Sequence, residues 1–361
     1  MTQGRFSTDF SSARELFVAS AKDAGALLES YEYPAPGPRG EILVTDIAWI
    51  GPADASKVFV AVSGTHGIEG FCGSAAQVDW LTRGEWKRLP ENTAAMLVHA
   101  INPYGFAWLR RVTHENVDLN RNFADFSHAP DLNPSYDDIA TALCPGEWTE
   151  ESQAQTMASL QGYITTHGYG KFVAAVSGGQ HRHADGLFYG GQGPCFSRKT
   201  LENIFKTRLA KAHRVGVVDY HTGLGPSGYG ELMTGAPRGS EDYARASRWY
   251  GSTVTPVGTA GSTSARISGD WISAMPDFLP RLEFTAIALE FGTIPPLEVL
   301  QALRADNWLH NHGDATRDWP PPVKQGMLRA FLGSDDIWRG MVLGQSLAVT
   351  RQAIQGLQLS P

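Results

Sequence analysis

The chain has 361 residues, of which 42% are hydrophobic and 10% aromatic, so it can bury a sizeable core, and disorder is excluded as its main state. Its formal net charge of −7 supplies no basic surface for a phosphate backbone, which argues against nucleic acid as a partner. No apolar run approaches the roughly 18 residues needed to span a bilayer, so we expect no membrane partner.

The lack of an apolar span and the N-terminal sequence together predict a cytoplasmic protein. The first residues, MTQGRFSTDFSSARELF, lack a basic segment followed by an apolar one and so do not resemble a secretory signal peptide. Cys72, Cys144 and Cys195 are odd in number and form no C-x-x-C pair, which argues against a disulfide framework or a thiolate zinc site. We expect them to be small buried hydrophobic residues.

In chain order, residues 5–30 have the pattern of an amphipathic helix, which the prolines of EYPAPGPRGEI terminate. Apolar, strand-like runs then alternate with helical patterns. The expected strands cover residues 42–51, 57–64, 94–102, 171–179, 215–223 and 284–293. The expected helices cover residues 73–84, 135–143, 151–168, 195–210, 296–313 and 335–357.

This alternation predicts an α/β fold with a mostly parallel or mixed twisted sheet and helices on both faces. We find no internal repeat and no low-complexity segment, and no shift in composition divides the chain. We therefore predict one domain over residues 1–361.

Polar side chains end several of the expected strands, where ligands bind in open α/β sheets. One strand leads to His66 and Glu69, and two later strands end at His221 and Glu290. Two neutral imidazoles and one carboxylate, with a fourth position for water, make up the ligand set of a catalytic zinc site. A lone histidine after a strand is more often an ordinary polar residue, so the H-x-x-E spacing alone is weak and the second histidine strengthens it.

Five segments in order resemble the zinc carboxypeptidase superfamily, which has the carboxypeptidase A-like fold. They are GTHGIEG, NPYGF, RVTHENVDLNRNF, DYHTG and ALEFGT, and the resemblance spans residues 58–293. GTHGIEG and SGGQHRHADGLFYGG further resemble a bacterial branch of that superfamily that is labelled as a domain of unknown function. A longer stretch than in compact members separates Glu69 from His221, and residues 125–195 are a possible insert that caps the cleft.

The resemblance implies roles for eight residues. His66, Glu69 and His221 would bind one Zn²⁺ per chain, and Asp118 would orient His66. Asn120 and Arg121 would receive a free substrate carboxylate. Arg111, with its neighbour Arg110 as the alternative, would stabilise the oxyanion, and Glu290 would be the general base. The region that holds a mobile tyrosine in the family has none here, and we assign no tyrosine proton donor.

These roles predict a zinc-dependent amide hydrolase, of carboxypeptidase type, that acts on a small molecule or short peptide with a free carboxylate. The alternative is an N-acyl amino acid deacylase of the aspartoacylase and succinylglutamate desuccinylase type, and a metal-free binding module is a third reading. GLGPSG at residues 223–228 matches a dinucleotide motif weakly, because no helix pattern follows it. We place His181 and His183 outside the metal set and expect His310 and His312 to face solvent.

Overall fold

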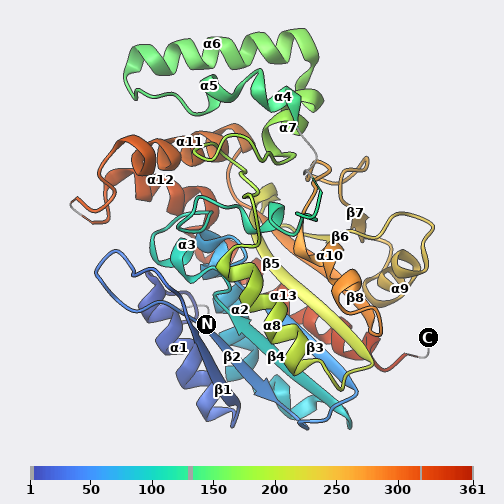
Figure 1. The fold of residues 1–361 in the computed structure, drawn as a ribbon. Coiled ribbons are helices and arrows are strands. Elements are labelled where there is room, and N and C mark those ends of the chain that lie inside the picture. The colour runs from blue at the N-terminus through green and yellow to red at the C-terminus, as the bar shows by residue number, and fades with distance from the viewer. Residues whose placement is uncertain (1–3, 129–132, 318, 360–361) are drawn as a thin grey trace.

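The computed structural model describes residues 4–128, 133–317 and 319–359. Its centre is an eight-stranded mixed sheet with the strand order β1-β2-β4-β3-β5-β8-β6-β7 (Figure 1). Within it β4, β3, β5 and β8 are parallel neighbours, while β1, β2 and β6 pair antiparallel. The strands are β1 (Leu27–Glu32), β2 (Val44–Ile50), β3 (Lys57–Val62), β4 (Thr93–His99), β5 (Arg214–Ser227), β6 (Gly230–Thr234), β7 (Thr255–Pro256) and β8 (Glu283–Gly292).

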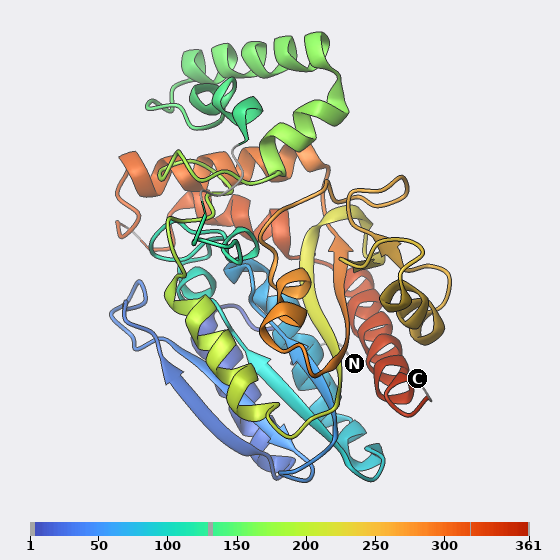
Figure 2. The same ribbon diagram turned by 45° about the vertical axis from the view of Figure 1, so that its right-hand side comes forward.

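Helices cover both faces of the sheet, which confirms the predicted α/β fold (Figure 2). The helices are α1 (Phe10–Asp23), α2 (Gly70–Thr82), α3 (Pro103–Ala107), α4 (Pro134–Asp137), α5 (Ala140–Leu143), α6 (Glu150–His167), α7 (Tyr169–Ser177), α8 (Phe196–Arg208), α9 (Glu241–Tyr250), α10 (Trp271–Phe278), α11 (Pro296–His312), α12 (Pro322–Phe331) and α13 (Asp336–Gly356). None of the helices in the described part of the chain is long and apolar enough to cross a membrane.

Alternate residues of each central strand supply two separate cores, as the period of two of a β-strand requires. In β3, Phe59 and Ala61 pack in the core that α1, α2, α9 and α13 cover. Val58, Val60 and Val62 point to the opposite face, under α8 and α10. The strands therefore read as continuous apolar runs because both faces are buried.

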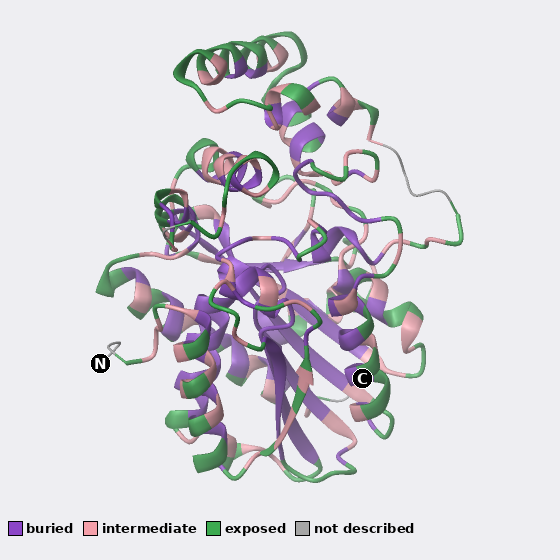
Figure 3. Cartoon of the chain, turned by 60° about the vertical axis from the view of Figure 1, so that its left-hand side comes forward, coloured by how far each residue is buried: buried purple, intermediate pink, exposed green. Residues whose placement is uncertain are grey.

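A third apolar core lies beyond the carboxyl ends of the parallel strands, among α3, α4–α7, α11 and α12. The helices α4–α7 stand on α11 at the top of the molecule (Figure 1). The long helix α6 is largely exposed, and only Thr156 and Leu160 of its residues are buried (Figure 3). This upper layer therefore lies over the sheet edge where ligands bind in α/β folds.

Two predicted elements are wrong. Residues 171–179, predicted as a strand, lie mostly in α7, where Phe172, Ala175 and Val176 form a helical stripe in the third core. A short apolar run fits either structure, and only its packing partners decide. The helix predicted over residues 5–30 ends at Asp23, and the edge strand β1 follows.

The cysteines agree with the prediction in part. None of the three forms a disulfide, and Cys72 and Cys195 are buried. Cys144 is only partly buried.

Candidate metal centre

The three predicted metal ligands come from two adjacent parallel strands. His66 follows the end of β3 and precedes a 3-10 turn, η1 (Gly67–Glu69), which ends in Glu69. His221 lies in β5, which pairs with β3. The turn requires glycine at position 67, because a Cβ there would lie 1.9 Å from the carbonyl carbon of Gly105.

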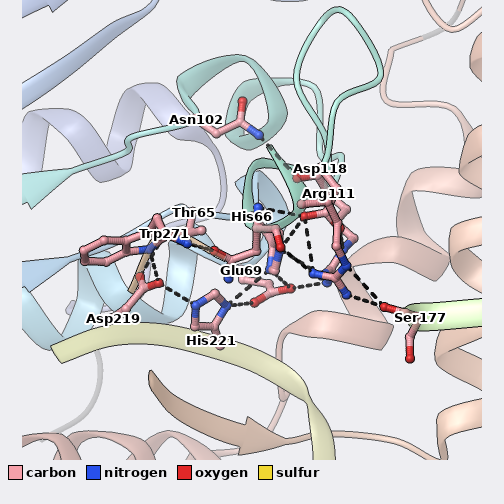
Figure 4. Close-up of polar contacts among 12 residues, drawn as sticks. Thr65, His66, Glu69, Asn102, Arg111, Asp118, Ser177, Asp219, His221 and Trp271 are labelled. Carbon is pink, nitrogen blue, oxygen red and sulfur yellow. Dashed lines mark hydrogen bonds and ion pairs between the residues drawn. The ribbon is translucent and has the colours of Figure 1, made fainter. Parts of the chain in front are cut away.

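The ligand atoms of these residues converge on one buried point (Figure 4). Nδ1 of His66 lies 3.0 Å from Oε1 of Glu69, and Nδ1 of His221 lies 3.0 Å from Oε2. The two Nδ1 atoms are 3.2 Å apart, and one ligand atom from each residue lies within 4.8 Å of the others. A buried group of two imidazoles and one carboxylate is compatible with a metal site.

A carboxylate behind each histidine fixes which ring nitrogen faces the centre. Nε2 of His66 lies 3.1 Å from Oδ1 of Asp118, and Nε2 of His221 lies 2.7 Å from Oδ2 of Asp219. If each Nε2 donates to its carboxylate, both Nδ1 atoms present lone pairs to each other and to Glu69. With neutral imidazoles, the three groups present lone pairs to one point, so the donor set fits a metal ion.

The role of Asp219 was missed by the sequence analysis. Besides His221, it accepts hydrogen bonds from Thr65 Oγ1 at 2.8 Å and from Trp271 Nε1 at 2.7 Å (Figure 4). Burial opposes the charged form of His221, but Asp219 and Glu69 outweigh it and raise the pKa of His221 well above its usual value. The available signal was the D-x-H spacing, since residues two apart in a strand share a face.

Arg111, and not Arg110, points to the metal centre. Its Nη1 lies 3.0 Å from Oε1 of Glu69, and its Nε lies 2.9 Å from Oδ2 of Asp118. Arg110 turns away and pairs with Asp306 at 3.1 Å. Nη2 of Arg111 also lies 2.8 Å from Nε2 of His66, which can either accept from Arg111 or donate to Asp118. A metal ion bound to Nδ1 would select the second arrangement, because it would leave the proton on Nε2.

Glu290 lies on β8 directly opposite His221 on β5. Its Oε1 accepts a hydrogen bond from the backbone N–H of Leu224 at 3.0 Å. Burial raises the pKa of Glu290 to about 8, and the neighbouring carboxylate of Glu69 adds to the rise. Burial also opposes ionisation of Glu69, but the two histidines and Arg111 hold its pKa well below the usual value. Two adjacent carboxyl groups are thus set to different protonation states, as in many acid–base sites.

Asn120 and Arg121 follow Asp118 in another 3-10 turn, η3 (Leu119–Arg121). The Arg121 guanidinium donates to the carbonyl of Asn120 at 2.8 Å and to that of Ser177, the last residue of α7, at 2.6 and 3.2 Å. Three of its five N–H groups are therefore directed at backbone carbonyls. Its Nη1 also lies 4.0 Å from Oδ1 of Asp118. Burial lowers the pKa of Arg121, and Asp118 partly offsets this.

A cavity of about 180 Å³ opens beside these residues. Six of the eight predicted site residues line it, and Glu69 and Asp118 lie directly behind His66 and Arg111. The six are His66, Arg111, Asn120, Arg121, His221 and Glu290. Asp270, which sequence reasoning did not single out, also lines the cavity, and burial raises its pKa.

The remaining histidines lie outside this cavity. His181 is 2.7 Å from the carbonyl of Gly191, and His183 is 2.7 Å from Asp137, so both hold loops in place. The prediction that His310 faces solvent is wrong. It is largely buried, and its Nε2 lies 2.8 Å from Nζ of Lys324.

The structure is similar to several solved structures at low sequence identity. Bovine thrombin-activatable fibrinolysis inhibitor is 11% identical, with 95% of this chain and 98% of that chain covered and a TM-score of 0.46. Carboxypeptidase A from Helicoverpa armigera is 12% identical, with 96% and 74% covered and a TM-score of 0.46. Succinylglutamate desuccinylase from Chromobacterium violaceum is 13% identical, with 82% and 72% covered and a TM-score of 0.38.

The sequence matches no curated protein. It does match one protein family over residues 6–345, which is most of its length. That family is described as "Protein of unknown function (DUF2817)", in agreement with the resemblance of GTHGIEG to a branch of unknown function. The chain belongs to this DUF2817 family.

Proposed function

We propose that the protein is a zinc-dependent amide hydrolase that acts on a small peptide or amide with a free carboxylate. The observation that carries the proposal is the buried group of His66, Glu69 and His221, whose three ligand atoms converge beside Glu290. Zinc held there would polarise the amide carbonyl and lower the pKa of a water molecule to about 7. We expect one ion per chain, because His66, Glu69 and His221 are the one group of this kind among the residues that the structure describes.

The residues around the centre supply the proton transfers and charge stabilisation of amide hydrolysis. Glu290, opposite His221 in the neighbouring strand, takes a proton from the attacking water and delivers it to the leaving nitrogen. Arg111 holds the negative charge that develops on the carbonyl oxygen. Asn120 and Arg121, which line the cavity, bind the substrate carboxylate.

A deacylase that releases an amino acid from a small N-acyl conjugate would use the same residues. The cavity is small and lies under α7, which favours small conjugates over protein chains as substrates. The two reactions differ in the second product. A carboxypeptidase releases an amino acid and a shortened peptide, whereas a deacylase releases an amino acid and a carboxylic acid. Chromatography of the products from matched peptide and N-acyl substrates separates the two.

The first experiment measures the metal content of the purified protein by mass spectrometry, beside a His66→Ala/His221→Ala double variant. We expect about one zinc per chain in the protein and none in the variant. A Glu290→Gln variant is the matched control, since it should keep the metal and lose hydrolysis. No bound metal and no uptake of added zinc would overturn the proposed function.

A further inference from the structure

The cavity beside the metal centre has a charged half and an apolar half. The charged half holds Arg111, Arg121 and Glu290. The apolar half is formed by α7 and α11, which cover the carboxyl ends of the parallel strands. Its side chains include Tyr169, Val173 and Val176 from α7 and Leu297, Leu300 and Leu303 from α11. We call these six residues the apolar roof.

The spacing of the roof residues places each set on one face of its helix. On α7 they are four and three residues apart, and on α11 they are three apart, so each set forms a stripe along the helix. The charged residues Lys171 and Glu298 lie on the same helices, are exposed and do not line the cavity. The residues of α7 and α11 that line the cavity are therefore all uncharged.

The roof is not fully covered by the protein itself. Val176 and Leu303 are buried in the third core, but Tyr169 is 50% exposed and Leu297 is 49% exposed. Both belong to the large hydrophobic side chains that the fold leaves in contact with water, and both line the cavity. An apolar ligand that covered them would remove this surface from water, which is favourable in proportion to the area buried.

We propose that the apolar roof binds a large aliphatic or aromatic group of the substrate, so that the substrate is an amphiphilic amide. Its free carboxylate meets Arg121 in the charged half, and its apolar group lies against α7 and α11. This inference rests on the proposed function, because it places the apolar group beside the same metal centre. It excludes small, wholly polar conjugates as good substrates, since they would leave the roof in water.

The test measures ligand binding apart from catalysis. Straight-chain carboxylic acids from acetate to decanoate are titrated into the protein as purified, by isothermal titration calorimetry. Each methylene that the roof buries should tighten the dissociation constant about three- to fourfold. A Tyr169→Ser/Leu297→Ser variant should weaken decanoate binding roughly tenfold and leave acetate binding unchanged. Both side chains are half exposed, so the fold should tolerate their loss.

The matched control is a Met157→Ser/Ile337→Ser variant. These side chains are 49% and 77% exposed, lie on α6 and α13, and do not line the cavity. The control should bind the whole acid series as the unaltered protein does. An affinity that does not change with chain length, or an equal loss in both double variants, would overturn the roof as a binding surface.

A second measurement separates this inference from the proposed function. The zinc-loaded protein is given N-acyl amino acids that differ only in acyl length. If hydrolysis is fastest with acetyl groups and slows with longer acyl chains, the binding role of the apolar roof is refuted, while the proposed hydrolase activity is supported. Conversely, the protein could bind longer acids more tightly and still hydrolyse none of the amides. That result would refute the proposed hydrolase activity and would support the apolar roof as a binding surface.

Discussion

Replacement of Asp219 by asparagine tests whether a buried negative charge behind His221 sets the metal affinity. Both His221 Nε2 and Trp271 Nε1 lie 2.7 Å from Oδ2 of Asp219, while Thr65 Oγ1 lies 2.8 Å from Oδ1. An asparagine can place its oxygen at the Oδ2 position and its NH₂ group at the Oδ1 position, where the Thr65 hydroxyl can accept. The hydrogen-bond geometry is then kept, and only the charge is lost.

We expect Asp219→Asn to weaken zinc binding about ten- to a hundredfold, which is about 1.4 to 2.7 kcal/mol. The assay is competition for zinc with a chelating indicator of known affinity, at neutral pH. Asp46→Asn is a matched control, because Asp46 is equally buried and accepts from Arg14 and Ser30 away from the metal centre. A zinc affinity within twofold of the unaltered protein in Asp219→Asn would refute the reasoning, provided that thermal unfolding shows an intact fold.

Three further predictions concern catalysis and stability. Glu290→Gln should lower kcat more than a hundredfold while zinc binding stays within a few-fold, measured with the same indicator. Arg111→Ala should lower kcat about a hundredfold, because it removes the group that stabilises the oxyanion. Zinc binding should not weaken, because the change removes a positive charge beside the candidate ligand Glu69. Weaker zinc binding would count against the role of Arg111 at the oxyanion. Burial lowers the pKa of His99 from 6.5 in the unfolded chain to about 4 in the folded protein. As the pH falls, the His99 ring is therefore protonated first in the unfolded chain, and the folded protein loses stability between pH 6.5 and about pH 4. Urea titrations at pH 7 and pH 5 measure the free energy of unfolding of the unaltered protein and of His99→Gln. Between these two pH values the unaltered protein should lose about 2 kcal/mol more than the variant, and equal losses would contradict this prediction.

The central strands and the convergence of the three candidate metal ligands could be predicted from the sequence because they depend on local patterns. Continuous apolar runs such as KVFVAVSG are typical of strands buried on both faces, and polar residues at their carboxyl ends meet at one sheet edge. The short strands β6 and β7 and the edge strand β1 were missed, because their sequences carry no such run. α7 was mistaken for a strand, because its identity depends on a core formed with distant helices.

The partners of the metal ligands depend on contacts that no local pattern encodes. Trp271 reaches Asp219 from the start of α10, and Thr65 reaches it from the loop that follows β3. Neither residue type is itself a sign of a metal site. His310 was expected to face solvent because it ends a helix, but α12 brings Lys324 against it.

The choice between Arg110 and Arg111 shows how backbone conformation decides a functional assignment. Leu109, just before them, has a φ of 51°, a left-handed conformation that costs energy for a leucine. Arg110 then pairs with Asp306 of α11, which also bonds the buried Lys324, while Arg111 bonds Glu69 at the metal centre. Two consecutive arginines thus connect the helix that carries half of the apolar roof to the centre where we place the reaction. The strained turn has a structural reason in this arrangement, because it directs the two side chains to different partners.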